Sequence, residues 1–150
     1  MKIAIGSDHA GFRLKEFLKD FLRESKCEVV DFGTDSEESV DYPDFAFKVC
    51  ESIVKQDVQF GILICGTGLG MSIAANKVKG IRASLCNDLF AARCAREHND
   101  ANVLCMGGRV LGEALAKEIV KIWLNGEFQG GRHERRIQKI TEYERKTHSD

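Results

Sequence analysis

Five short runs of apolar and β-branched residues recur along the chain, each followed by a stretch with helical spacing. The runs are residues 2–5, 28–32, 60–65, 81–86 and 101–106. Their lengths suit strands that are buried on both faces. The repeated order of strand and helix predicts a parallel sheet with helices on both sides.

The intervening segments have apolar stripes typical of amphipathic helices. The stripes comprise Leu14, Phe17, Leu18, Phe21 and Leu22, then Phe45, Val49 and Ile53, and later Leu115, Ile119 and Ile122. Spacings of three and four residues place each stripe on one helical face. The single proline, Pro43, suits the first turn of the second helix, and the first helix is expected to start near Ala10. We therefore expect a three-layer α/β/α sandwich with a five-stranded parallel Rossmann-like sheet.

The segment from Asn125 onward differs from the rest of the chain. It opens with a glycine-rich break and continues as a charged helix whose apolar positions are Ile137, Ile140 and Tyr143. This stripe is too narrow to join the main core, so the helix is expected to dock against something else. Nothing marks a domain boundary, and residues 1–150 are expected to form one domain with 125–150 as an extension.

Charge and cysteine content exclude several classes of function. The chain has 22 basic and 23 acidic residues, which gives no overall field for binding nucleic acid. No apolar run approaches the ~18 residues of a membrane span, and the first residues do not form a signal peptide. The six cysteines lack zinc-site spacing and are expected to be free thiols in a reducing compartment. We expect a cytoplasmic protein without a bound metal.

Candidate chemistry gathers where the predicted strands end. In parallel α/β sheets, ligands bind outside the carboxyl ends of the strands. The segments at those ends are residues 6–9, 33–35, 65–68, 87–88 and 107–109. They bring glycines, acids, a thiol and a histidine to one edge of the sheet.

The loop from Gly66 to Gly70 has glycine at three of its five positions. Its backbone N–H groups can approach a phosphate or an oxyanion that forms during a reaction, and the following helix adds its positive end. A tight turn without a ligand fits the spacing equally well. The spacing does not match a dinucleotide fingerprint. Residues 6–11 have the length of a P-loop, but Phe12 and Arg13 stand where Lys-Ser/Thr is needed, which disfavours nucleotide hydrolysis.

Cys65 lies at the end of a strand, directly before this loop. Most cysteines in strands are small buried hydrophobes. Backbone N–H groups and a helix start nearby favour the thiolate, however, so Cys65 is a candidate base or nucleophile. The other five cysteines have no comparable setting and are interpreted as packing residues.

Histidines and arginines offer further candidates, each with a structural alternative. His98 could be catalytic or could interact with the end of a helix, and Asp8 beside His9 could bind a ligand or cap a helix. Arg132 and Arg136 share a helical face and suit a phosphate, as does Arg109. They could instead belong to a solvated face that pairs with nearby glutamates.

Four features together resemble the type B ribose-5-phosphate isomerases. They are GSDHAG at 6–11, CGTGLGMSIAANK at 65–77, EHNDANVLCMGGR at 97–109, and the pair Arg132 and Arg136. The resemblance covers essentially the whole chain. Some members of the family carry a glutamate where this chain has Met71, and methionine cannot accept a proton, so the sequence fits the members that use a cysteine base.

The resemblance implies an aldose–ketose isomerase that acts on ribose 5-phosphate and ribulose 5-phosphate through a cis-enediolate, in the pentose phosphate pathway. It implies no metal or organic cofactor, and a homodimer or dimer of dimers whose sites are shared between subunits. The C-terminal helix would then extend to the partner subunit. Related isomerases act on allose and galactose 6-phosphates, so a six-carbon substrate is an alternative.

Roles follow from the matching positions. Cys65 would move the proton, His98 would open the sugar ring, and Thr67 would assist at the hydroxyl proton. The backbone of Gly66, Thr67, Gly68, Leu69 and Gly70 would hold the enediolate oxygen. The sugar would contact Asp8, His9 and Asn99, and the phosphate Arg109, Arg132 and Arg136. Two other functions are alternatives to an isomerase. A sugar-phosphate binding module without catalysis would not need an activated thiol, and a redox-sensing thiol protein would not need the arginines.

Overall fold

The computed structural model describes residues 1–148, and its centre is a sheet of five parallel strands. The strands are β1 (Lys2–Ser7), β2 (Glu28–Asp31), β3 (Phe60–Cys65), β4 (Ala83–Leu85) and β5 (Val103–Gly107). All four pairings are parallel. The predicted five-stranded parallel sheet is therefore confirmed, with β4 shorter than the run from which it was predicted.

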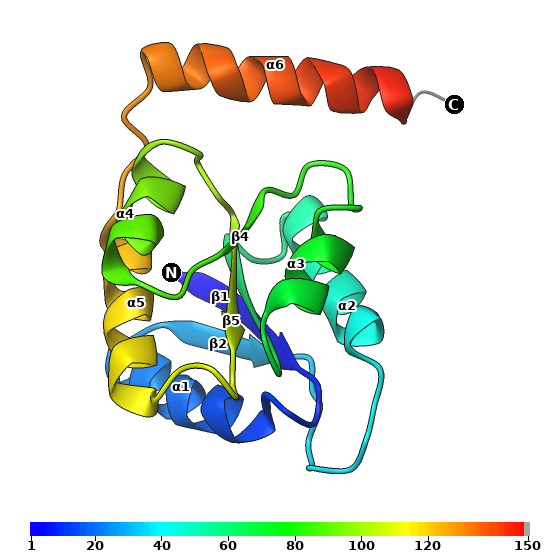
Figure 1. The fold of residues 1–150 in the computed structure, drawn as a ribbon, viewed down its shortest axis with the longest axis vertical. Helices are drawn as coiled ribbons and strands as arrows, with labels where there is room; N and C mark the ends of the chain where they lie inside the picture. The colour runs from blue at the N-terminus through cyan, green and yellow to red at the C-terminus, as the bar shows by residue number, and fades with distance from the viewer. Residues whose placement is uncertain (149–150) are drawn as a thin grey trace.

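Helices cover both faces of the sheet, as expected for buried parallel strands (Figure 1). They are α1 (Phe12–Glu24), α2 (Tyr42–Val54), α3 (Leu69–Ala75), α4 (Leu89–Glu97), α5 (Glu113–Asn125) and α6 (Arg132–Thr147). Helices α1, α4 and α5 pack on one face and α2 and α3 on the other. The three-layer sandwich is thus confirmed. Helix α1 starts two residues later than expected, after a turn at Asp8–Gly11.

Two apolar cores result from the alternation of side chains along the strands. Ile3 and Ile5 face α1, α4 and α5, whereas Ala4 between them faces α2 and α3. The stripe predicted for α5 is displaced, because Leu115 is 40% exposed while Trp123 is fully buried. Both layers are well packed, so the sheet gives its loops a rigid base.

The spatial order of the strands is β2-β1-β3-β5-β4, so β5 lies between β3 and β4. The chain reverses its direction across the sheet at β1 and β3, which makes their carboxyl ends the expected binding crevice. Because β5 is inserted beside β3, Gly107 is the register partner of Cys65. Because β5, and not β4, pairs with β3, the loop after β5 lies next to the thiol of Cys65.

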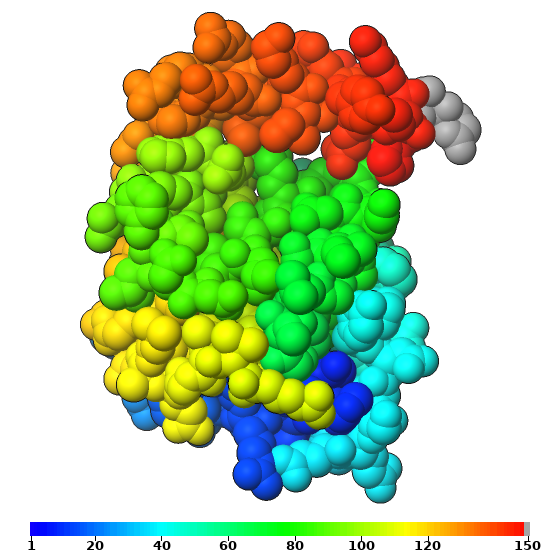
Figure 2. All heavy atoms as spheres, viewed as in Figure 1, coloured from blue at the N-terminus to red at the C-terminus, as the bar shows by residue number. Residues whose placement is uncertain are grey.

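Helix α6 lies outside the three layers of the sandwich and crosses the amino-terminal end of the sheet (Figure 1). Figure 2 shows the same helix as a layer across one end of the molecule. Its side chains Ile140 and Tyr143 are 55% and 70% exposed, and Ile137 is half-buried. Near its carboxyl end, Glu144 accepts a hydrogen bond from the N–H of Gly80 at 3.1 Å. The apolar stripe is thus largely uncovered by the chain itself.

Candidate active site

Cys65 is buried at the carboxyl end of β3, where its sulfur accepts a hydrogen bond from the N–H of Gly68 at 3.1 Å. Gly68 has a φ of 81°, and a Cβ there would lie 2.5 Å from the side chain of Leu85. Glycine is therefore required at this position by both backbone conformation and space.

The other buried thiols have a different environment. Burial raises the pKa of Cys50 and of Cys86 to about 12, and it raises the pKa of Cys105 well above its ordinary value. These groups are protonated at neutral pH and pack within the two apolar cores. This environment agrees with their interpretation as packing residues. Among the four buried cysteines, Cys65 is the one whose sulfur accepts a backbone N–H.

The rest of the glycine loop lies at the carboxyl edge of the sheet, where Thr67 and Leu69 are exposed. The Oγ1 of Thr67 accepts the N–H of Leu69 at 3.2 Å. Gly70, in the first turn of α3, lies against the ring of Tyr42, since a Cβ at Gly70 would lie 2.5 Å from the ring. The sequence did not single out Tyr42. Its only signal is its place directly before Pro43, at the start of a helix.

The loop after β5 is joined to the glycine loop by two backbone hydrogen bonds. The N–H of Gly108 donates to the carbonyl of Cys65 at 2.8 Å, and the N–H of Arg109 donates to the carbonyl of Gly66 at 3.0 Å. The Arg109 side chain is exposed and passes close to Gly66. A guanidinium is thus placed beside the glycine loop, where an anionic ligand could reach it.

Asp8 and His9 follow β1 at the same edge. Asp8 is 6% exposed, its N–H donates to the Ile64 carbonyl at 3.2 Å, and its Oδ1 accepts the N–H groups of Ala10 and Gly11. The carboxylate therefore shapes the turn before α1 but does not cap the helix, whose N-cap is Gly11 without a side-chain cap hydrogen bond. His9 accepts the N–H of Val40 at Nδ1, 3.2 Å away, which leaves the proton of a neutral ring on Nε2.

Four of the predicted site residues lie at the opposite, amino-terminal edge of the sheet. His98 follows α4 and precedes β5, Asn99 comes next, and Arg132 and Arg136 lie on α6. Strand β5 rises about 3.3 Å per residue, so roughly 13 Å of strand separates its two ends. One chain therefore does not bring His98, Asn99, Arg132 and Arg136 together with Cys65.

This second group has an internal organisation of its own. His98 stacks on His133, with ring centroids 4.2 Å apart and planes 7° from parallel. Desolvation lowers the pKa of His133, with His98, Arg132 and Arg136 acting in the same direction. His133 was not among the residues predicted from the sequence. The available signal was helical spacing, since residues 133 and 136 share a face.

Arg132 and Arg136 are exposed at the start of α6. Within residues 1–148, no salt bridge joins either guanidinium to an acidic side chain. The alternative of a solvated face paired with Glu134 and Glu142 therefore has no support in these contacts. Both groups are available for an anion.

Comparison with known proteins decides the family. Residues 3–140 match the family described as Ribose/Galactose Isomerase. The chain belongs to this family. Ribose-5-phosphate isomerase B of Escherichia coli (strain K12) is 50% identical over 145 residues, which cover 97% of each chain.

Two solved structures of members of the ribose/galactose isomerase family show the same fold. The ribose-5-phosphate isomerase B of Clostridium thermocellum has a TM-score of 0.97 and 58% identity, covering 98% of this chain and 99% of its own. The enzyme of Mycoplasma genitalium, solved with bound ribulose-5-phosphate, has a TM-score of 0.92 and 44% identity, covering 96% of each chain. The family resemblance read from the sequence is confirmed.

The described residues contain neither a metal-binding cluster nor a membrane-spanning helix. Within residues 1–148, no group of three or more His, Cys, Asp and Glu side chains is arranged to hold a metal ion. In the same part of the chain, no helix is long and apolar enough to cross a membrane.

Proposed function

We propose that this chain interconverts ribose 5-phosphate and ribulose 5-phosphate in the pentose phosphate pathway, with Cys65 as the base. The observation that carries the proposal is the thiol of Cys65, held by the N–H of Gly68 at the mouth of a glycine loop. Isomerisation requires a base beside C2 and fixed donors for the negative charge that develops on oxygen. Cys65 and residues 66–70 provide these two elements within one turn of chain.

In the proposed reaction, the Cys65 thiolate removes the proton from C2 of the open aldose. The electron pair moves into the C1–C2 bond, and the carbonyl oxygen at C1 becomes the enediolate oxygen. Two loop N–H groups are already engaged, that of Gly68 with the sulfur and that of Leu69 with Thr67. The remaining loop donors stabilise the oxyanion. Thr67 assists transfer of the proton from the C2 hydroxyl to the oxygen on C1. Cys65 then returns its proton to C1.

The site is completed by a second copy of the chain. Asp8, His9, the glycine loop and Arg109 of one copy face His98, Asn99, Arg132 and Arg136 of the other. Two observations support this arrangement: the two groups lie at opposite ends of one sheet, and the stripe of α6 is uncovered at Ile140 and Tyr143. A homodimer, or a dimer of dimers, would bury the stripe and unite the groups.

In the completed site, His98 donates a proton to the ring oxygen of the furanose and so releases the open aldose. Asp8, His9 and Asn99 contact the sugar hydroxyls. Arg109, Arg132 and Arg136 neutralise the phosphate, for which guanidinium groups give paired, charge-assisted hydrogen bonds. The binding energy of the phosphate then serves to hold C1 and C2 against Cys65.

Residues 1–150 form a single sugar-phosphate isomerase domain in this proposal, and the protein acts in the cytoplasm. The six cysteines support a reducing location, since all of them are free thiols. A six-carbon substrate is the second candidate, because the family description includes galactose as well as ribose.

Steady-state kcat/KM for ribose 5-phosphate and for allose 6-phosphate, measured on the wild type and on Cys65→Ala, tests the proposal. The half-buried Cys27, which lies away from the loop, provides the matched control Cys27→Ala. We expect preference for the pentose phosphate and a loss on the order of 10²- to 10⁴-fold or more in Cys65→Ala alone. Wild-type turnover in that variant would mean that the base lies elsewhere.

A further inference from the structure

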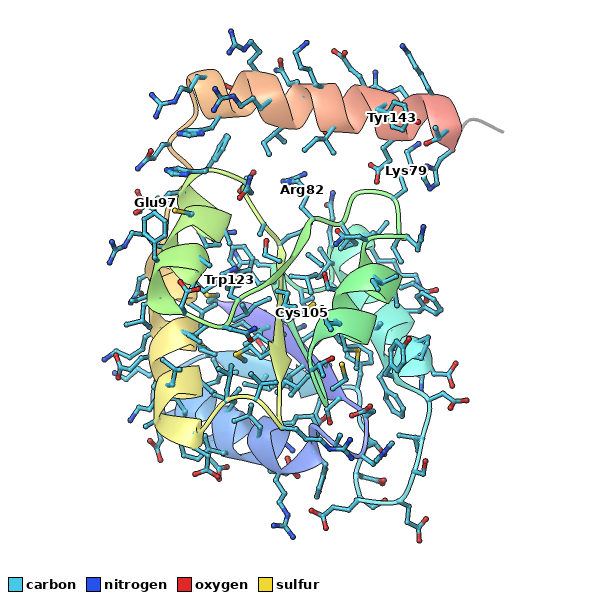
Figure 3. All side chains as sticks on the ribbon, viewed as in Figure 1. Lys79, Arg82, Glu97, Cys105, Trp123 and Tyr143 are labelled. Carbon is cyan, nitrogen blue, oxygen red and sulfur yellow. The ribbon has the colours of Figure 1, made fainter. Side chains whose placement is uncertain are left out.

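Arg82, which directly precedes β4, makes several hydrogen bonds to the segment that follows α4. Its Nε donates to the carbonyls of Asn99 at 3.0 Å and Asp100 at 3.1 Å. Its Nη2 donates to the Asp100 carbonyl at 2.7 Å and to the Asp100 carboxylate at 3.2 Å. Figure 3 shows the Arg82 side chain at the edge of the sheet that faces α6.

The backbone of Arg82 is fixed as well. Its N–H donates to Oδ1 of Asn102 at 2.8 Å, and its carbonyl accepts the N–H of Asn102 at 3.0 Å. Asn102 also donates from Nδ2 to the carbonyl of Gly80 at 2.9 Å, and the Gly80 N–H bonds Glu144 of α6. Arg82 thus belongs to a network that links β4, β5 and α6.

The segment held by Arg82 needs external support. Helix α4 ends at Glu97, and the carbonyls of Asn99 and Asp100, which Arg82 binds, lie beyond the helix. Asp100 has a φ of 45°, in the left-handed region that non-glycine residues adopt at a cost. The guanidinium binds the carbonyls on both sides of this bend, and its planar fork suits two neighbouring acceptors.

Arg82 is not one of the predicted site residues, but it bonds the backbone of the segment that contains two of them. The segment that it anchors begins with His98 and Asn99, whose side chains face the partner's site in the proposed dimer. We propose that Arg82 is a positioning residue for ring opening, which holds the His98–Asn99 segment in its productive orientation. This inference rests on the proposed function, and it assigns Arg82 no contact with the substrate.

The main test is a double-mutant cycle on ribose 5-phosphate with Arg82→Ala, His98→Asn and the combined variant. A displacement of about 1 Å can cost ~10²-fold in rate, so we expect kcat to fall on the order of 10- to 100-fold in Arg82→Ala. Because Arg82 acts on ring opening through His98, a step in which Asn99 has no assigned role, the combined variant should lose no more kcat than His98→Asn alone. The control is Arg93→Ala, an exposed arginine on α4, which should retain wild-type kcat.

Arg82→Lys distinguishes a loss of positioning from a loss of the fold. Lysine keeps the charge and a donor but lacks the fork, so its kcat should lie between those of the wild type and Arg82→Ala, with a melting temperature near that of the wild type. If His98→Asn itself retains wild-type kcat, the proposed role of His98 fails. If His98→Asn is impaired but Arg82→Ala is not, or if the two losses multiply, only the positioning role of Arg82 is overturned.

Discussion

His98 and His133 stack with their ring centroids 4.2 Å apart, so the residue proposed to open the sugar ring rests on the first turn of α6. The stack connects α4 to α6 independently of the bond between Glu144 and Gly80. Desolvation and the neighbouring His98, Arg132 and Arg136 all lower the pKa of His133. A positive charge on His133 in the stack is therefore disfavoured.

The lowered pKa of His133 predicts acid sensitivity of the fold. As pH falls below about 6.5, the unfolded chain takes up a proton on His133 that the folded chain resists, so folding stability decreases. His133→Asn removes this contribution. We expect the urea midpoint to fall less between pH 7.5 and 5.5 in His133→Asn than in the wild type.

The matched control is His148→Gln, because His148 is an exposed histidine at the other end of α6. Its urea midpoints should follow those of the wild type across the same pH range. Equal pH dependence in wild type and His133→Asn would show that protonation of His133 is not linked to folding.

The sequence predicted the sheet because each strand carries its own signal. Runs such as 60–65 have the length and composition of strands buried on both faces, and local pattern is enough to read them. The spatial order of the strands has no such signal, because β5 pairs with β3 through contacts distant in sequence. The length of β4 was overestimated, because the apolar run covers residues 81–86 whereas the ladder with β5 comprises Ala83–Leu85.

The candidate site was predictable at the carboxyl edge and incomplete elsewhere. Cys65 and the glycine loop are contiguous in sequence, so their proximity follows from one turn of chain. The motif containing His98 lies at the other end of β5, and a linear sequence does not show which edge a loop occupies. Tyr42 and His133 were missed because each acts through a contact with another element, Gly70 or His98.

His98→Asn is predicted to impair cyclic substrates most. D-erythrose 4-phosphate has no free hydroxyl at C4 and cannot close a furanose ring, so its isomerisation bypasses ring opening. We expect a loss on the order of 10²-fold or more on ribose 5-phosphate and a clearly smaller loss on the tetrose phosphate, both measured as kcat/KM. Similar losses on the two substrates would assign His98 to proton transfer or to the fold.

Lys15 is predicted to stabilise the loop that ends β2. Its side chain is fully buried, and its Nζ lies 2.7 Å from Asp31, whose other oxygen accepts the N–H of Gly33 at 2.8 Å. Partial burial acts to raise the pKa of Asp31, but the hydrogen bonds from Lys15 and Lys19 hold it below its ordinary value. The Gly33 carbonyl in turn accepts the N–H of Ser7 beside Asp8.

Lys15→Met should therefore cost about 1 to 3 kcal/mol of unfolding free energy, measured by urea titration at pH 7. Ionised Asp31 contributes stability above its ordinary pKa, and this contribution is lost as pH falls through the folded value. The acid unfolding midpoint should consequently rise in Lys15→Met. Lys121→Met is the control, because its exposed pair with Glu118 at 3.9 Å should contribute little. Identical acid midpoints in wild type and Lys15→Met would contradict this account.

The shared site predicts that a variant with weakened substrate binding and a variant without the base restore activity together. Arg136→Ala should leave the oligomer intact and raise KM on the order of 10- to 100-fold, because a charged hydrogen bond contributes about 1.5 to 3 kcal/mol. Deleting residues 130–150 should weaken both oligomerisation and substrate binding, since it also removes Ile140 and Tyr143. These two variants separate loss of a phosphate ligand from loss of the interface.

Mixing Arg136→Ala with Cys65→Ala then tests the origin of each half of the site. In a hybrid dimer, the chain with intact Cys65 faces the partner with intact Arg136, so one of the two sites is complete. Since Cys65 and α6 lie at opposite ends of the sheet in each chain, we expect turnover at low substrate concentration to exceed that of either variant alone. Subunit exchange is followed by native mass spectrometry of differently tagged chains. Hybrids that form but remain as inactive as their parents would place Cys65 and Arg136 of each site on the same chain.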